Sequence, residues 1–157
     1  MEFPQLVAAF TSAVESGDGN RLAALFTDDG VYVDGFYGPF AGRAAIAGML
    51  AHHFHDHARD FLWEMSDPVS NGRIGYARYL FSYTSTMPES AGRRVIFSGT
   101  GCFELEGALI KRYSENFDRG MALAQLDFAP ERIRKALLRW AKGEAERPDA
   151  GPHHRAA

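Results

Sequence analysis

The sequence predicts an α+β fold in which helices pack on one face of a bent, mostly antiparallel sheet. Apolar residues recur at helical spacing through the first third of the chain. From Phe61 to Phe117 the period changes to two, which is typical of half-buried strands. A helical pattern returns after Pro130. The predicted order is therefore helices, then a meander of long strands, then helices.

Three helices are expected before the strands. The first is indicated by apolar residues four apart: Leu6, Phe10 and Val14. Asp18 is a residue type that caps helices, so a short second helix should follow it. A third helix is predicted from Arg43 to His53, after a loop rich in glycine and aromatic residues over 35–42.

The strands are separated by turn residues. Residues 27–30 have the sequence TDDG, which predicts a turn before a short strand from Val31 to Asp34. Asn71-Gly72 is a strong tight-hairpin pattern. Three long strands are then expected: Ile74–Thr86, Val95–Leu105 and Leu109–Phe117. Asp118 should cap a short helix, and Pro130 should open the last one.

Composition narrows the class of protein. The 157 residues fit one domain, predicted to span 1–143, with a polar tail over 144–157 that we expect to be disordered. A net charge of −3 gives no general attraction for nucleic acid or an anionic membrane. Cys102 is the only cysteine, so no internal disulfide can form. No apolar run approaches the ~20 residues of a membrane span, and we expect a cytoplasmic protein.

Three segments of the chain resemble a known fold. They are FTSAVESGDGNRLAALFTDDGVYVDG at 10–35, GRAAI at 42–46 and FELEGALIKRYSENFD at 103–118. Together they resemble the nuclear-transport-factor-two-like superfamily, in particular its SnoaL-like and ketosteroid-isomerase-like members, over residues 3–125. The resemblance implies a cone: a curved sheet with the N-terminal helices on its concave face, a C-terminal helix, and an enclosed apolar pocket. It also implies a homodimer and chemistry without a cofactor.

Asp34 ends the first strand and is the first candidate catalytic residue. The resemblance places it at the general base of the isomerase. An acid in an apolar pocket has a raised pKa and is a usable base. The residues alone favour another interpretation, an Asx-turn acid bonded to nearby backbone. The isomerase's two oxyanion donors correspond here to Phe10 and Gly101, which have no donor group, so steroid isomerisation by that mechanism is not expected.

Glu115 is the second candidate. By the same resemblance Tyr113, Glu115 and Phe117 share the pocket-facing side of the last strand. A buried carboxylate there must be paired or protonated. It could therefore act as a second acid/base group, form an ion pair with an arginine such as Arg78, or point outward if the register differs by one residue.

Four histidines, His52, His53, His55 and His57, follow the third helix. Their pattern matches no zinc motif, and a helix end is a poor scaffold for a metal, so no metal site is predicted. His53 at the pocket mouth could instead shuttle protons. The alternative is a solvated helix end.

Aromatic residues at strand alternation could line a pocket for a flat apolar ligand, or form an ordinary core and a dimer face. The residues expected to line the pocket are Phe10, Phe36, Trp63, Tyr79, Phe81, Phe97, Tyr113 and Phe117.

Two functions remain open at this point. The first is a cofactor-independent enzyme in which Asp34, with Glu115 or His53, transfers a proton on a small hydrophobic substrate. It would be of the isomerase, dehydratase, cyclase or hydrolase type. The second is a non-catalytic module of the same fold that binds a ligand or serves dimer assembly. An enzyme should place Asp34 inside an apolar pocket with a second titratable group nearby, whereas a binding module could leave Asp34 on the surface or tied up in a turn.

Overall fold

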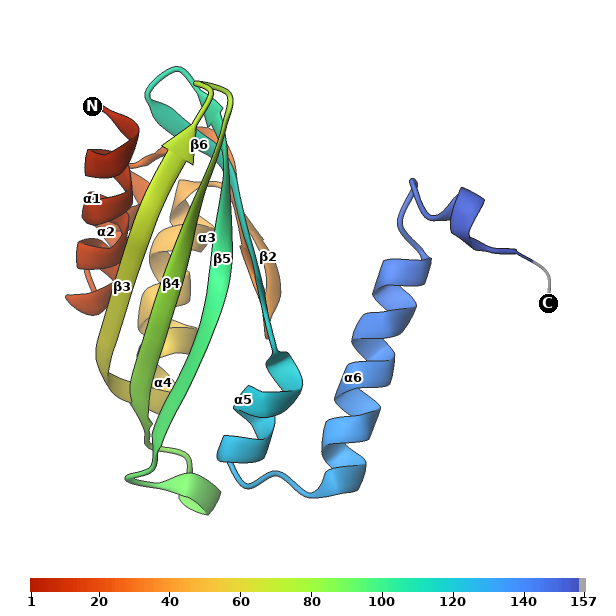
Figure 1. Cartoon of the computed structure of the whole chain (residues 1–157). Helices are drawn as coiled ribbons and strands as arrows, with labels where there is room; N and C mark the ends of the chain where they lie inside the picture. Colours follow the sequence, from red (N-terminus) through yellow and green to blue (C-terminus); the bar gives the residue numbers. More distant parts are fainter. Residues whose placement is uncertain (156–157) are drawn as a thin grey trace.

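A computed structural model describes residues 1–155 and shows one curved, open sheet (Figure 1). The six strands lie in the order β2-β1-β6-β5-β4-β3. All neighbours are antiparallel except β1 and β6, which are parallel. The strands are β1 (Phe26–Asp34), β2 (Gly38–Ala41), β3 (Ala58–Ser70), β4 (Ile74–Ser85), β5 (Arg94–Glu106) and β6 (Leu109–Phe117).

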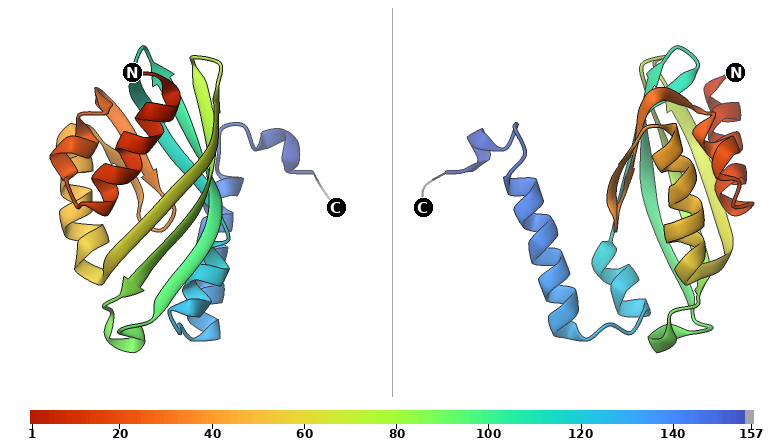
Figure 2. Two further views of the ribbon diagram at one scale, coloured as in Figure 1. Left: turned by 60° about the vertical axis from the view of Figure 1, so that its left-hand side comes forward. Right: turned by 180° about the vertical axis from the view of Figure 1, so that it is seen from behind.

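Three N-terminal helices pack on one face of this sheet, as Figures 1 and 2 show. They are α1 (Phe3–Glu15), α2 (Gly19–Ala23) and α3 (Arg43–Met49). The apolar side of α1 is buried, with Phe10 completely inaccessible. Asp18 caps α2 by accepting a hydrogen bond from the Arg21 N–H at 2.9 Å. The predicted α+β class, with helices covering the concave face, is confirmed.

The helical segment that begins with α3 is longer than predicted. After Met49 it continues as a π-helical turn, η1 (Leu50–Phe54), and a last turn, α4 (His55–His57), so the chain stays helical four residues beyond His53. No glycine or proline interrupts residues 49–57, so nothing in the local chain stops the helix. Single π-helical turns are frequent at functional sites because they reorient side chains.

The predicted turn over 27–30 is instead an irregularity within a strand. β1 already begins at Phe26, and its register against β6 shifts between Phe26 and Val31. The Arg43 guanidinium donates to the Phe26 carbonyl at 3.0 and 2.7 Å. This carbonyl lies where the bulge interrupts the strand pairing, so the arginine supplies its hydrogen-bond donors. The turn-forming residues therefore make a bulge, and the strand is longer than predicted.

The long strands and the hairpin are confirmed. β3 and β4 pair antiparallel around Asn71, whose side chain accepts the N–H groups of Arg73 and Ile74 at 3.0 and 2.9 Å. These bonds close the turn, as expected for asparagine.

Two helices follow the sheet. α5 (Arg119–Gln125) is capped by Asp118, which accepts the Met121 N–H at 2.9 Å. α6 (Pro130–Ala145) stands apart from the sheet beyond α5 (Figures 1 and 2). A short 3-10 turn, η3 (Gly151–His153), lies in the segment predicted as a disordered tail. The boundary at 143 stays a prediction, and residues 156–157 lie outside the described residues. No helix in residues 1–155 is long and apolar enough to cross a membrane.

Gly19 allows α2 to approach α3 closely, which predicts a destabilising substitution. A Cβ at Gly19 would lie 3.0 Å from the Cα of Ala47 and nearer still to its carbonyl oxygen. Because backbone cannot swing aside as a side chain can, we expect Gly19→Ala to lower the free energy of unfolding by about 1–3 kcal/mol in urea titrations.

Gly48→Ala is the matched control within α3. Its Cβ would meet only His52, at an ordinary 3.8 Å, and alanine favours helix, so this variant should be as stable as the wild type or more so. Equal effects of the two substitutions would contradict the close packing of α2 on α3.

Candidate functional site

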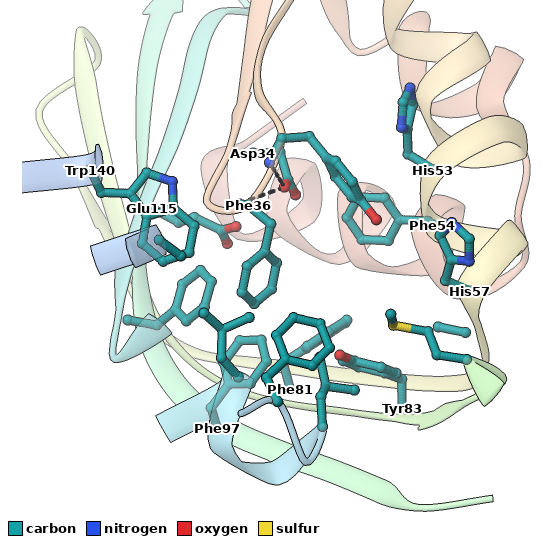
Figure 3. A pocket seen from close by; sticks show the side chains of 18 of the residues that line it. Asp34, Phe36, His53, Phe54, His57, Phe81, Tyr83, Phe97, Glu115 and Trp140 are labelled. Atoms are coloured by element: carbon teal, nitrogen blue, oxygen red, sulfur yellow. Dashed lines mark hydrogen bonds between the residues drawn. The ribbon is translucent and has the colours of Figure 1, made fainter. Parts of the chain in front are cut away.

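A cavity of about 550 Å³ opens on the concave side of the sheet (Figure 3). Its walls come from β1, β3–β6, the η1–α4 turn, α5 and α6, and they are mainly aromatic. Nine of the residues proposed from the sequence line it: Asp34, Phe36, His53, Trp63, Tyr79, Phe81, Phe97, Glu115 and Phe117.

The parallel pairing of β1 with β6 brings the two candidate acids together. Tyr32 pairs with Tyr113 in this register. Two residues further along each strand, on the same face, are Asp34 and Glu115. Both carboxyl groups point into the cavity (Figure 3).

Asp34 is 5% exposed, lines the cavity, and forms the turn that the residues alone favour. Its Oδ1 accepts the backbone N–H groups of Phe36 and Tyr37 at 2.8 and 2.9 Å, which is an Asx turn. Its Oδ2 takes part in neither bond. Burial raises the pKa of Asp34, while the two N–H groups and the nearby His53 oppose that rise. The carboxyl group is therefore fixed by one oxygen and available through the other.

Glu115 is held by two tyrosines. The phenols of Tyr79 and Tyr113 each donate to its Oε2, both at 3.1 Å. Burial, followed by the negative charge of Asp34, raises the pKa of Glu115 to about 8, although the two phenols favour the ionised form. Glu115 is therefore mainly protonated at pH 7. Oε2 accepts both phenol hydrogen bonds, so Oε1 is the oxygen that the phenols leave free. Arg78, the alternative partner, forms an ion pair with Asp67 instead.

Two glycines of β5 make this arrangement possible. A Cβ at Gly99 would meet the ring and hydroxyl of Tyr79 at 2.5 Å, so only glycine lets Tyr79 reach across β5 from β4. A Cβ at Gly101 would lie 3.0–3.2 Å from the Tyr113 side chain. Gly101 pairs directly with Glu115 in the β5–β6 register. Gly101, which has no side chain to act as an oxyanion donor, thus leaves room for the Tyr113 phenol. That phenol donates to Glu115.

Two residues expected to line the pocket do not. Phe10 packs within the solid core, with ring centroids 4.6 Å from Tyr113 and 5.8 Å from Tyr32. Tyr113 is also fully buried, and it acts on the site only through the hydroxyl that meets Glu115. Both face the concave side, as predicted, but α1 covers that part of the sheet and fills the space above it.

The histidines separate from one another. His53 lines the cavity, with its ring 4.8 Å from that of Tyr37 and 5.1 Å from that of Phe40. His57 also lines it, which the sequence analysis missed. His55 packs against Phe61, with ring centroids 4.8 Å apart. Within residues 1–155, no three His, Cys, Asp or Glu side chains gather as a metal would require.

One wall of the cavity was not predicted at all. Helix α6 contributes Arg132, Lys135, Ala136, Arg139 and Trp140. Its amphipathic sequence was visible, but the face that α6 would cover depends on its path after α5, which no local pattern encodes.

The raised pKa of Glu115 predicts a pH-dependent stability. Between its ordinary pKa of 4.5 and about 8, the folded protein holds a proton that the unfolded chain has released. The free energy of unfolding should therefore fall as pH rises through this window. In Glu115→Gln, which keeps an acceptor for both phenols, this loss should disappear, so the variant should gain a few kcal/mol on the wild type between pH 5 and 9 in urea titrations.

Glu89→Gln serves as the control because Glu89 is exposed in the short 3-10 turn η2 (Pro88–Ser90). Its stability should follow the wild type at every pH. Parallel curves for the wild type and Glu115→Gln would show that Glu115 ionises as an ordinary acid.

Solved structures share this architecture. A ketosteroid isomerase-like protein from Catenulispora acidiphila, in complex with trimethylamine, superposes with a TM-score of 0.71 at 21% identity, covering 82% of this chain and all of its own. A candidate polyketide cyclase from Xanthomonas campestris superposes with a TM-score of 0.65 at 22% identity, covering 78% of this chain and 95% of its own. An LEH-like epoxide hydrolase from M. tuberculosis superposes with a TM-score of 0.62 at 21% identity, covering 85% of this chain and 92% of its own. At these identities the likeness shows the fold alone.

No curated protein matches the chain. The SnoaL-like domain family matches residues 7–113. That match covers most of the chain, including α2, α3, most of α1 and all of β1–β5. The chain therefore belongs to the SnoaL-like domain family.

Proposed function

We propose that this protein catalyses proton transfer on a small hydrophobic substrate with its own side chains. The observation that carries the proposal is the pair of carboxyl groups in one apolar cavity, each held by different hydrogen-bond donors. Glu115 is largely neutral at pH 7, whereas Asp34 is supported in its ionised form by two N–H groups. Pairs of acids whose pKa values are pushed apart by their surroundings are typical acid–base machinery.

Asp34 is the proposed base. Its Oδ1 is anchored by the Asx turn, so Oδ2 is presented to the cavity in a fixed direction. Burial raises its pKa, which makes the carboxylate a stronger base than an exposed aspartate.

Glu115 is the proposed acid. Its protonated Oε1 can donate to an oxygen on which negative charge develops as Asp34 removes the proton. The two phenols on Oε2 orient the group and stabilise it if it passes its own proton on.

His53 completes the proposal as the group that exchanges protons with solvent, because it is half-buried and lines the same cavity. The isomerase, dehydratase, cyclase and hydrolase types all begin with such a proton transfer. The neighbours described as a candidate polyketide cyclase and an epoxide hydrolase fall within these types.

A simple carbon acid tests the proposal without knowledge of the natural substrate. 2-Tetralone is a flat, apolar ketone whose α-hydrogens exchange in D₂O, which NMR follows directly. The wild type should accelerate exchange. Asp34→Asn should reduce the enzymatic rate by about 10²–10⁴ because the base is lost. Glu115→Gln should reduce it by about 10²–10³ because the acidic donor is lost.

Glu89→Gln, at an exposed residue that does not line the cavity, should exchange 2-tetralone as fast as the wild type. Binding of 2-tetralone without faster exchange would contradict catalysis and favour the binding-module alternative. Full activity of Asp34→Asn would show that Asp34 is not the base.

We also propose that the outer face of the sheet forms a homodimer. Leu62, Leu80 and Ile96 lie there on three neighbouring strands and are 45–49% exposed. Because large exposed apolar side chains gathered on one face favour association, Leu80→Glu should convert the dimer to a monomer in light scattering at micromolar concentration. Leu138→Glu, an equally exposed change on α6, should leave the dimer intact. A monomeric wild type would contradict this proposal.

A further inference from the structure

Helix α6 presents three basic side chains to the cavity. Arg132, Lys135 and Arg139 all line it. Their spacing places them on one side of the helix, over a length of about 10 Å. They contribute the only Lys or Arg side chains among the cavity-lining residues that the structure describes.

These three cations have no anionic partner within residues 1–155. None of the ion pairs there includes Arg132, Lys135 or Arg139. Further along the chain, by contrast, Lys142 pairs with Glu146, and Arg147 pairs with Glu144 and Asp149. In this described part of the chain, Arg132, Lys135 and Arg139 are thus unpaired and line the cavity, whereas Arg134 on the same helix is unpaired but does not line it.

The cations do not serve the two buried acids either. Neither Asp34 nor Glu115 forms an ion pair with any residue in the described chain. Asp34 is supported by backbone N–H groups, and Glu115 by two phenols. The three positive charges of α6 are therefore available to an anionic ligand that enters the cavity.

Aromatic rings of the cavity position two of the cations. The Arg132 guanidinium lies 3.8 Å from the ring centroid of Phe128, and that of Arg139 lies 5.8 Å from the centroid of Trp140. A guanidinium over a ring face keeps its N–H edge free to donate. Carboxylate and phosphate groups accept such an edge in bidentate fashion.

We infer that the substrate is amphipathic: an apolar body within the aromatic part of the cavity and one anionic group bound by Arg132, Lys135 and Arg139 of α6. The inference rests on the proposed function, and it fixes the direction in which the substrate enters. An anionic group beside Asp34 would be repelled by that carboxylate, so the charged end belongs at α6. A cavity of about 550 Å³ is large enough for two fused rings with a substituent.

Matched pairs of naphthalene compounds test the inference by calorimetry. 2-Naphthoate and 2-naphthamide share the same rings and differ in charge. The wild type should bind the carboxylate about tenfold more tightly, or more, at low salt because charged hydrogen bonds are stronger than neutral ones. 2-Naphthyl phosphate distinguishes a carboxylate site from a phosphate site by which of the two anions binds more tightly.

Two double variants locate the effect. Arg132→Gln with Arg139→Gln should abolish the preference for the anions and leave the binding of 2-naphthamide unchanged. Arg134→Gln with Lys142→Gln removes the same charge from residues of α6 that do not line the cavity, so it should keep the preference. Equal binding of amide and carboxylate by the wild type, or equal losses in both double variants, would overturn the inference.

The preference for anions can be measured independently of catalysis. Asp34→Asn should stop the exchange of 2-tetralone yet retain the preference for 2-naphthoate. Loss of exchange with intact anion preference therefore bears on the acid–base proposal, and loss of anion preference with intact exchange bears on the α6 site.

Discussion

The site depends on two carboxyl groups placed side by side in an apolar cavity by the parallel β1–β6 pairing. Two such groups cannot both carry a charge there without a large cost, because their mutual repulsion adds to the cost of burying each charge. The structure resolves this by treating them differently. Asp34 receives two backbone N–H groups, and Glu115 keeps a proton. The proposed division into a base and an acid rests on this difference in support.

The support of Glu115 explains why this chain departs from the isomerase pattern. There the donors are a tyrosine on the first helix and an acid on the penultimate strand, where this chain has Phe10 and Gly101. Here the acid lies one strand over, on β6. Tyr79 and Tyr113 reach it because Gly99 and Gly101 leave the surface of β5 open. Because the phenols that reach Glu115 come from β4 and β6, Phe10 on α1 can pack in the core without removing a donor from the site.

The sequence predicted the parts of this structure that have local causes. Hydrophobic periods gave the helices and long strands, and Asn71-Gly72 and the two aspartate caps fixed where elements begin and end. The prediction for the TDDG segment was wrong because turn-forming residues also form bulges. Distant contacts distinguish the two, such as that of Arg43 with the Phe26 carbonyl and the pairing of β1 with β6. The nearness of Asp34 to Glu115 came from resemblance, since pairing across some eighty residues has no local pattern. The wall formed by α6 was missed for the same reason.

In the proposed function, one arrangement gives Asp34 both a structural and a catalytic role. The Asx turn was the competing explanation for this residue, and the turn is present. However, a carboxylate has two oxygens, and the turn uses only Oδ1. A base must be held in one orientation if its free oxygen is to meet a substrate proton, and a flexible side chain would lose that alignment. The turn supplies the alignment with backbone groups that cannot accept a proton themselves. The hydrogen bonds that the competing explanation invoked are therefore also the ones that the proposed base at the end of β1 would require.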